Sequence, residues 1–273
     1  MTKLNWRAAG IATAAIAVLS AAPAGAVAPA GQQDPIAATA TEAGAAAAPA
    51  ASAPRVIPST VVIGRSWEGR PIVAVRQGNA RATKVLLVLG QMHGNETRAP
   101  LVVDAVRRLK AQTPSNVAIW TIRTMNPDGA ARGTRRNAHD VDLNRNFPYL
   151  WSASVNYPAP RSVSEVETRA MYNFLRFVRP DVVVSFHQPF GLIDGDSPKS
   201  LPWAYFLSNY TGVPVGIAGC SGPCYGTMTA WFNARFPGWA MTFEFGSYPS
   251  QALIDRTART LVTVLPPRVI DYR

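Results

Sequence analysis

Short apolar segments alternate with longer amphipathic segments from residue 56 to residue 273. The segment Lys84–Leu89 is apolar after its first residue, which is typical of a strand buried on both faces. Thr97–Ala111 has apolar side chains at helical spacing and basic residues near its end, so we predict a helix there. By the same criteria we predict further strands at Val61–Ile63, Pro71–Val75, Val117–Ile122, Asp181–Phe186 and Met241–Phe245, and further helices at Ser164–Val178 and Ser250–Val264.

This order of elements predicts the fold class. Strands separated by helices favour an α/β fold, because parallel strands need long crossover connections and these are usually helical. We therefore expect a single domain with a mixed, mostly parallel central sheet that is covered by helices on both faces. About 218 of the 273 residues follow Arg55, enough for one sizeable core.

The first 26 residues have the pattern of a secretory signal peptide. Lys3 and Arg7 precede the apolar stretch Ala8–Ala22, and the small residues Ala24-Gly25-Ala26 follow, which predicts cleavage after Ala26. A permanent membrane anchor is the alternative, but the stretch is Ala-rich and short for a bilayer span. We expect a secreted or cell-envelope protein with no stable membrane span after cleavage.

Residues 27–55 have a different composition, rich in Ala and Pro. Few large apolar side chains are present to offset the entropy lost on ordering, so we expect a disordered linker. The catalytic domain is then predicted to span residues 56–273.

Composition and charge narrow the classes of function. Hydrophobic residues make up 48% of the chain and charged residues 16%, which excludes a disordered polyelectrolyte. The net charge is +11, but only Arg132, Arg135 and Arg136 form a tight basic group and no reader motif is present, so we expect no nucleic-acid partner. In an exported protein this charge favours association with an anionic cell envelope, with solubility alone as the alternative.

Candidate metal ligands follow two of the predicted strands. His93 and Glu96 come just after Lys84–Leu89, three residues apart, and His187 directly follows Asp181–Phe186. Ligands and catalytic groups collect at strand ends in α/β sheets, and two imidazoles with one carboxylate are a catalytic zinc set. The third histidine, His139, lies in a polar segment, where we expect a solvent-exposed role.

Polar residues elsewhere have the chemistry of a hydrolytic site. Asn144 and Arg145 form a pair flanked by apolar residues, and a guanidinium can hold a carboxylate with two hydrogen bonds. Glu244 lies inside the apolar strand Met241–Phe245. Burial there should raise the pKa of its carboxyl group and suit it to proton transfer.

Together these motifs resemble the zinc metallocarboxypeptidase family, the carboxypeptidase A-like peptidases. The resemblance extends from the segment Gly64–Pro71 to Glu244, and the short domain is most similar to bacterial murein peptide amidases and γ-D-glutamyl-diaminopimelate peptidases. It implies that His93, Glu96 and His187 bind one Zn²⁺ ion per chain.

The resemblance also implies roles for the surrounding residues. Glu244 would be the general base that activates the water on the zinc ion, and Arg135 would polarise the scissile carbonyl. Arg135 is preferred to Arg136 because the family pattern is Arg-x-Asn. Asn144 and Arg145 would bind the terminal carboxylate of the substrate. The acceptor that orients His93 would be Asp142.

The region after His187 departs from the digestive carboxypeptidases. Tyr225 is a hypothetical substitute for their substrate-contacting tyrosine. Asp194 and Asp196 could meet a substrate amino group, but solvated loop acids are the favoured interpretation. Cys220 and Cys224 are expected to form a local disulfide, because two thiols alone lack the partners for a metal site.

The predicted function is that of a secreted, monomeric zinc-dependent metallopeptidase. It would hydrolyse an amide bond next to a free carboxylate in a peptide or murein-peptide substrate, with cell-wall peptides favoured. A general carboxypeptidase or an acyl-amino-acid deacylase on the same fold is the first alternative. A non-catalytic envelope-binding module is the second, and it is disfavoured because no ligand or base is missing.

Overall fold

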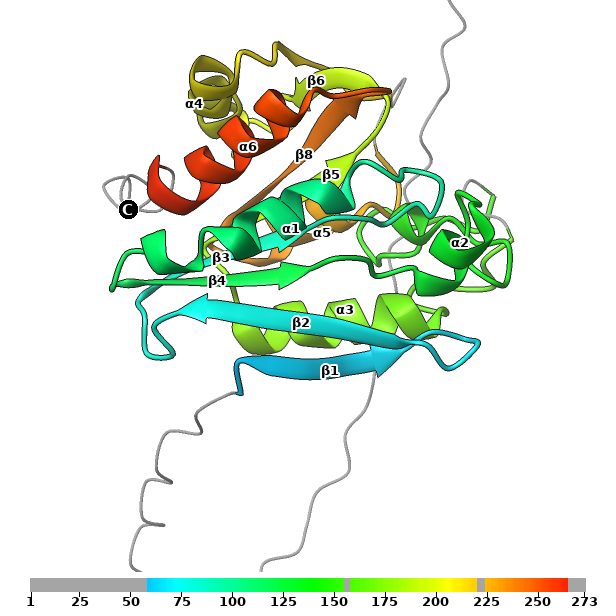
Figure 1. Cartoon of the computed structure of the whole chain (residues 1–273). Coiled ribbons are helices and arrows are strands. Elements are labelled where there is room, and N and C mark those ends of the chain that lie inside the picture. The colour runs from blue at the N-terminus through cyan, green and yellow to red at the C-terminus, as the bar shows by residue number, and fades with distance from the viewer. Residues whose placement is uncertain (1–57, 155–157, 220–223, 265–273) are drawn as a thin grey trace, which may run out of the picture. The chain divides into compact units, whose positions relative to one another are not determined.

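Eight strands form one sheet in the order β1-β2-β4-β3-β5-β8-β6-β7 in the part of the chain that the computed structural model describes (Figure 1). That part comprises residues 58–154, 158–219 and 224–264. All of it belongs to the second of the two units, Ser52–Arg273, into which the chain divides. The strands are β1 (Thr60–Arg65), β2 (Pro71–Gly78), β3 (Lys84–Leu89), β4 (Val117–Ile122), β5 (Val182–His187), β6 (Phe190–Asp194), β7 (Val215–Gly216) and β8 (Trp239–Gly246).

The centre of the sheet is parallel and its margins are mixed. Strand β3 pairs in parallel with β4 and β5, and β5 pairs in parallel with β8. At the margins, β1–β2, β2–β4 and β6–β8 are antiparallel, while β6–β7 is parallel. The predicted mixed sheet with a parallel centre is thereby confirmed, and the carboxyl ends of β3, β5 and β8 meet at one edge.

Helices cover both faces of this sheet. One face packs on α1, α4 and α6, and the other on α3 and α5. None of the helices in the described part of the chain is long and apolar enough to cross a membrane. The helices are α1 (Pro100–Arg108), α2 (Pro127–Arg132), α3 (Val166–Val178), α4 (Leu201–Thr211), α5 (Met228–Arg235) and α6 (Gln251–Arg259), with shorter helical turns η1 (Lys110–Gln112), η2 (Leu143–Arg145) and η3 (Thr260–Val264).

Strand β3 shows how the sequence builds two cores. Leu86 and Val88 pack into the cluster with α1 and α6, whereas Leu87 and Leu89 pack into the cluster with α3 and α5. Successive side chains of a strand point to opposite faces, so a continuous apolar run supplies both cores at once.

The predicted strands are all present, and most of their bounds shift by one to three residues. The predicted helix Thr97–Ala111 begins later, at Pro100, because residues 97–99 form turns after the Glu96 segment and proline suits the first helical turn. Five elements were not predicted: α2, β6, α4, β7 and α5. Helix α2 and strands β6 and β7 are too short for the hydrophobic periodicity of the sequence to reveal them. Strand β6 is held in the sheet by its antiparallel pairing with β8.

Candidate active site

His93 and Glu96 lie in a tight turn directly after β3. The Glu96 amide donates a hydrogen bond to the His93 carbonyl oxygen at 3.1 Å, so both side chains point to the same side. Gly94 between them packs against α2, where a Cβ atom would overlap the backbone of Gly129 and Ala130. The turn can therefore approach α2 this closely only with glycine at this position.

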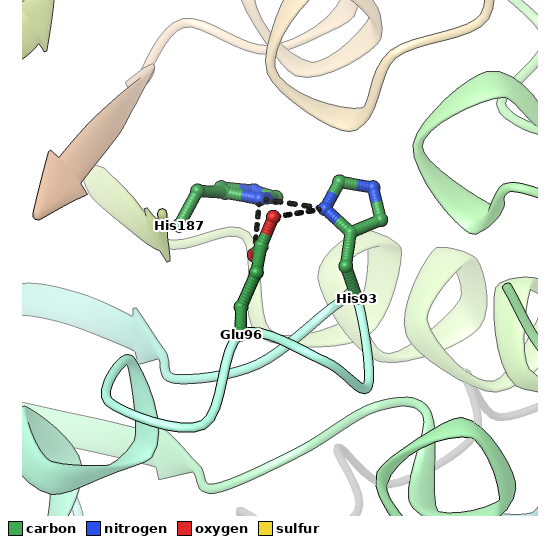
Figure 2. Close-up of side chains that lie close together, drawn as sticks. All are labelled: His93, Glu96 and His187. Atoms are coloured by element: carbon green, nitrogen blue, oxygen red, sulfur yellow. Dashed lines mark hydrogen bonds and ion pairs between the residues drawn. The ribbon is translucent and has the colours of Figure 1, made fainter. Parts of the chain in front are cut away.

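His187 is the last residue of β5 and meets this turn across the edge of the sheet. Its Nδ1 atom lies 3.0 Å from Glu96 Oε2 and 3.1 Å from His93 Nδ1, and His93 Nδ1 lies 2.7 Å from Glu96 Oε1 (Figure 2). All three side chains are at most 5% exposed. Within the described residues, they are the one group of three or more such side chains that could hold a metal ion.

Contacts of the two Nε2 atoms fix the orientation of the imidazole rings in this cluster. His93 Nε2 lies 3.0 Å from Asp142 Oδ1, and His187 Nε2 lies 3.0 Å from Ser185 Oγ. When each Nε2 donates its proton to these oxygens, both Nδ1 lone pairs point at the Glu96 carboxylate. Three electron-rich groups then face one another in a buried space, an arrangement that fits a bound cation. Two nitrogens and one carboxylate are the donor set of a catalytic zinc ion.

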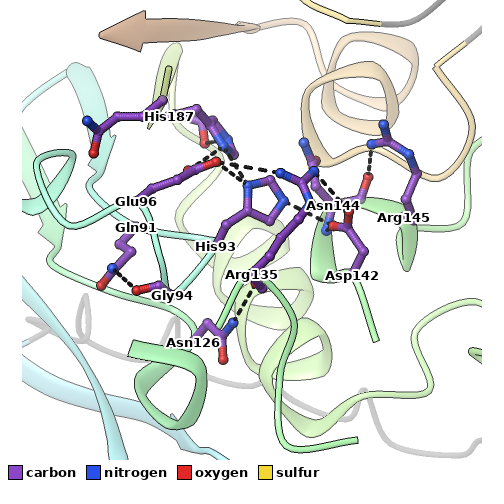
Figure 3. A network of polar contacts seen from close by, with 12 residues as sticks. Gln91, His93, Gly94, Glu96, Asn126, Arg135, Asp142, Asn144, Arg145 and His187 are labelled. Carbon is purple, nitrogen blue, oxygen red and sulfur yellow. Dashed lines mark hydrogen bonds and ion pairs between the residues drawn. The ribbon is translucent and has the colours of Figure 1, made fainter. Parts of the chain in front are cut away.

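Arg135 lies beside this cluster and shares Asp142 with His93 (Figure 3). Its Nε and Nη2 atoms donate to Asp142 Oδ2 at 3.1 and 3.0 Å, and its Nη1 atom lies 3.7 Å from Glu96 Oε1. Burial would raise the pKa of Asp142, but the hydrogen bond from His93 and the charges around it hold that pKa well below its usual range. Asp142 therefore stays ionised and fixes both neighbours.

Asn137 closes the loop that presents Arg135 and Asp142. Its Oδ1 atom accepts the amides of His139 and Val141 at 3.1 and 3.0 Å, and its Nδ2 atom donates to the buried Glu165 at 2.8 Å. His139 is 37% exposed and its Nδ1 atom lies 2.9 Å from Glu165. His139 is therefore exposed, as predicted, although it also contacts a buried carboxylate.

Asn144 and Arg145 lie on the helical turn η2. The Asn144 amide donates to Asp142 Oδ1 at 2.9 Å, and the Asn144 Oδ1 atom accepts the Met228 amide at 3.1 Å. Arg145 Nη1 donates to the Asn144 carbonyl oxygen at 2.8 Å. Both side chains line the cavity that His93 and His187 also line.

Glu244 lies opposite His187 in the register of β5 and β8. Its side chain is 6% exposed, and its Oε2 atom has no hydrogen-bond partner among the described residues. Burial, reinforced by the negative charge of Glu96, raises the pKa of Glu244 to about 7. A carboxyl group with a pKa near neutrality is suited to accept and return a proton.

One cavity of about 280 Å³ is lined by His93, Arg135, Asn144, Arg145, His187 and Glu244. Its wall includes Arg135, Arg145 and Glu244, together with residues that the sequence did not single out: Gln188, Pro189, Phe190, Ala218, Gly219, Thr227 and Thr242. A second cavity of about 290 Å³ adjoins it, lined by Glu96, Arg98 and Tyr248 and sharing Gln188 and Pro189 with the first. Members of the cluster therefore border both cavities, His93 and His187 the first and Glu96 the second.

The structure brings together the predicted site residues His93, Glu96, His187, Asp142, Arg135, Asn144, Arg145 and Glu244. Ser185 was missed, although a polar residue two positions before a histidine on a buried strand shares its face and was a usable signal. The prediction of a solvated loop acid is wrong for Asp194, which is half-buried at the end of β6 and lines the cavity, and right for the exposed Asp196.

Two predictions in this region stay untested. Cys220 lies outside the described residues, so the disulfide with Cys224 remains a prediction. Tyr225 lies in the described part of the chain, and its role as a substrate-contacting residue remains a hypothesis.

Comparisons with known proteins agree on the family. Residues 48–192 match the family model described as zinc carboxypeptidase, a range that includes all three candidate metal ligands. Murein peptide amidase A of Escherichia coli K12 is 32% identical over 201 residues, covering 66% of this chain and 82% of that protein. Murein peptide amidase A of Vibrio campbellii is 30% identical over 192 residues, covering 63% of this chain and 73% of that protein.

Solved structures support the fold. The murein-tripeptide amidase of Escherichia coli O157 has a TM-score of 0.61 at 24% identity, covering 78% of this chain and 94% of that one. Carboxypeptidase A of Helicoverpa armigera has a TM-score of 0.62 at 17% identity, covering 77% of this chain and 66% of that one. The chain belongs to the zinc carboxypeptidase family and is a hydrolase that uses one zinc ion.

Proposed function

We propose that this protein hydrolyses an amide bond next to a free carboxylate in cell-wall peptides. The observation on which this rests is that His93 and His187 of the candidate metal cluster, the base candidate Glu244 and two arginines line one cavity. The relatives named murein peptide amidase support the choice of substrate.

The buried donor set supports His93, Glu96 and His187 as the ligands of the metal. A zinc ion bound there supplies a Lewis acid that polarises a carbonyl group and lowers the pKa of water. Asp142 and Ser185 hold the two imidazoles in the orientation that this binding requires, through contacts of 3.0 Å each.

Glu244 transfers the proton in the reaction, and Arg135 stabilises the negative charge that develops. Glu244 accepts the proton of the attacking water and delivers it to the nitrogen of the leaving group, which its raised pKa favours. Arg135, held by two bonds to Asp142, donates a hydrogen bond to the carbonyl oxygen as negative charge develops on it.

Asn144 and Arg145 bind the free carboxylate beside the scissile bond. A guanidinium can bind both carboxylate oxygens, and Arg145 lines the same cavity as Glu244. This contact selects an amide at the carboxyl end of a chain. The adjoining cavity beside Glu96 has room for the acyl side of the substrate.

The test is hydrolysis of two substrates by the purified protein, with zinc content measured in parallel. One is a murein tripeptide with a γ-D-glutamyl-diaminopimelate bond, and the other is a blocked ordinary dipeptide. We expect cleavage of the first, and we expect Glu244→Gln to lower kcat by at least about 100-fold while zinc stays bound.

Each alternative outcome has a distinct meaning. Cleavage of the dipeptide alone would make the protein a general carboxypeptidase and refute the cell-wall substrate. Zinc binding with neither activity would direct the search to acyl-amino acids. Full activity of Glu244→Gln would remove Glu244 from the mechanism.

We also propose that the protein acts outside the cytoplasm, at the cell envelope. Support comes from the signal-like residues 1–26 and from the charge after Arg55, where 24 basic and 14 acidic residues give a net charge of about +10. The N-terminal sequence of protein recovered from the extracytoplasmic fraction tests export. Salt-sensitive binding to isolated cell walls tests the association, and equal binding in low and high salt would refute it.

A further inference from the structure

Two buried carboxylates at the start of α3 hold one side-chain amide of the loop that presents Arg135. Asn137 Nδ2 donates hydrogen bonds to Glu165 Oε2 at 2.8 Å and to Glu167 Oε2 at 3.2 Å. The side chain of Glu165 is 3% exposed, and that of Glu167 is fully buried. The proposed mechanism uses neither carboxylate, so their place beside this loop needs an explanation.

Burying two carboxylates close together destabilises a fold unless other groups compensate for it. Burial raises the pKa of Glu167, and the negative charge of Glu165 adds to that effect. Contacts from other segments offset this cost. His139 Nδ1 lies 2.9 Å from Glu165 Oε2, and the Trp67 amide donates to Glu167 Oε1 at 3.0 Å. The pair therefore joins α3 to the β1–β2 hairpin and to the loop of Asn137.

Glu165 is itself held in place by its neighbours. It is the residue before α3, and its amide donates to Asn146 Oδ1 at 3.2 Å. Its Oε1 atom accepts a hydrogen bond from Ser164 Oγ at 2.7 Å, and Ser164 Oγ in turn accepts one from Asn146 Nδ2 at 3.0 Å. Glu165 thus provides a fixed acceptor from which Asn137 is positioned.

The other end of the Asn137 side chain shapes the loop. Its Oδ1 atom accepts the amides of His139 and Val141 at 3.1 and 3.0 Å. The main-chain amide of Asn137 also donates to the Val141 carbonyl oxygen at 3.1 Å. These three bonds close residues 137–141 into a compact loop, and Arg135 lies only two residues before it.

Arg135 and Asp142, on either side of this loop, are held to different degrees (Figure 3). Asp142 is fixed independently, because its Oδ1 atom accepts an amide of η2 at 2.9 Å. The carbonyl oxygen of Arg135 has longer contacts, 3.3 Å from the Gly94 amide and 3.4 Å from Asn126 Nδ2. A displacement of Asn137 therefore moves Arg135 more than it moves Asp142.

We propose that Glu165 is a positioning residue, which acts through Asn137 to hold Arg135 where it meets the carbonyl oxygen of the substrate. The inference rests on the proposed function for the role of Arg135. A misplacement of about 1 Å far from the chemistry lowers the rate by up to about 100-fold. Because Arg135 acts on charge that develops in the transition state, kcat rather than KM depends on Glu165.

Two variants that each shorten one carboxylate form a matched pair. Glu165→Asp and Glu167→Asp both keep a negative charge and remove one methylene group, but only the first withdraws the acceptor of the 2.8 Å bond to Asn137. Glu165→Gln is the rescue variant, because it keeps the chain length and an oxygen that can accept from Asn137. Thermal unfolding of each variant measures what the change costs the fold.

The kinetic test uses whichever of the two substrates the protein cleaves, the murein tripeptide or the dipeptide. We expect Glu165→Asp to lower kcat by about 10-fold, with KM and zinc affinity within about twofold of the original values. Glu165→Gln and Glu167→Asp should keep kcat within about threefold. Equal losses in the two aspartate variants would overturn the inference.

A double-mutant cycle tests whether Glu165 acts through Arg135. In the Arg135→Ala background, Glu165→Asp should change kcat by less than about twofold, because the group that it positions is already gone. A loss of about 10-fold in that background as well would show independent effects and overturn the inference.

A spectroscopic test does not depend on activity. Arg135 Nε donates to Asp142 Oδ2 at 3.1 Å, so the NMR signal of its N–H group, assigned by its loss in Arg135→Ala, reports the position of the guanidinium. We expect this signal to shift in Glu165→Asp and to stay unchanged in Glu167→Asp. An unchanged signal in Glu165→Asp would overturn the inference.

A milder variant covers the case in which Glu165→Asp does not fold. Ser164→Ala removes the 2.7 Å bond to Glu165 Oε1 and leaves both buried carboxylates in place. We expect it to shift the Arg135 signal and to lower kcat in the same direction, by about threefold. No change in either quantity would overturn the inference.

The inference and the proposed function fail in different ways. If neither substrate is cleaved but the Arg135 signal responds to Glu165→Asp and not to Glu167→Asp, the proposed function fails and Glu165 still holds Arg135. If a substrate is cleaved and Arg135→Ala lowers kcat while Glu165→Asp does not, the role of Arg135 stands and the inference fails.

Discussion

Asp142 contacts two parts of the site, the candidate metal ligand His93 and the arginine Arg135. One of its oxygens lies 3.0 Å from His93 Nε2, and the other accepts two bonds from Arg135. A single carboxylate therefore orients a candidate metal ligand and the arginine that is expected to stabilise the oxyanion. This dual contact explains why the two predicted motifs, far apart in the sequence, converge.

We predict that Asp142→Asn weakens zinc binding by about 10- to 100-fold, because partners of metal-ligating histidines have effects of that size. The asparagine cannot offer two anionic oxygens, so kcat/KM should fall as well. Competition with a chelator of known affinity measures the first effect. Asp140→Asn is the control, because Asp140 lies in the same loop, is 78% exposed and pairs only with Arg136 among the described residues. An unchanged zinc affinity in Asp142→Asn would contradict the prediction.

At the residue scale the sequence indicated the candidate metal ligands, because histidine is rare in the chain and two of the three histidines follow buried strands. It misjudged Asp194. A carboxylate in a segment rich in Gly, Ser and Pro has the composition of a solvated loop, and only the pairing of β6 with β8 and β7 brings it to the cavity wall.

At the scale of elements, the hairpin that joins β1 to β2 is bonded to α2 through one buried carboxylate. Asp128 accepts hydrogen bonds from Ser66 Oγ at 2.7 Å, the Glu68 amide at 2.9 Å and Arg70 Nη1 at 2.7 Å. Because α2 also packs against Gly94, in the turn that holds the candidate ligands His93 and Glu96, this contact connects the edge of the sheet to the site.

We predict that Asp128→Asn lowers the free energy of unfolding at neutral pH by about 2 kcal/mol, the scale of buried hydrogen bonds to a charged group. Burial would raise the pKa of Asp128, but its hydrogen bonds lower it below the usual value. Its contribution is therefore present above the unfolded pKa near 4 and is lost as the pH falls through the lowered folded pKa.

Denaturant unfolding between about pH 2 and 7 measures this effect. The difference between the original protein and Asp128→Asn should be largest at neutral pH and shrink toward pH 2. A difference that does not change with pH would show that the charge of Asp128 is not the cause.

At the scale of the whole molecule, the site lies where three parallel strands end. Strands β3, β5 and β8 pair side by side, so the turn with His93 and Glu96, His187 and Glu244 meet at one edge. The helices packed on both faces of the sheet hold these strands in place, and so they also fix the positions of the site residues at the strand ends.

We predict that zinc removal lowers the Tm of the protein and that zinc restores it. Without a cation, two imidazole lone pairs and a carboxylate face one another in a buried space, whereas bound metal stabilises the folded state by mass action, by about 4 kcal/mol at 1,000 times Kd. Thermal unfolding with a chelator, followed by zinc addition, measures the shift. Glu244→Gln should show the same zinc dependence, because Glu244 lies outside the cluster. An equal Tm with and without zinc would exclude the cluster as a tight metal site.

The sequence by itself determined the parallel centre of the sheet, the two-faced core and the residue types of the site. It did so because periodicity, strand-end histidines and a glutamate inside an apolar strand are local patterns that burial imposes. Only the tertiary structure decided which partners fix those residues: Ser185 behind His187, Asp142 shared by His93 and Arg135, and Asp194 in the cavity wall. These contacts join segments through strand pairing and loop packing, and such long-range distances leave no periodic trace along the chain.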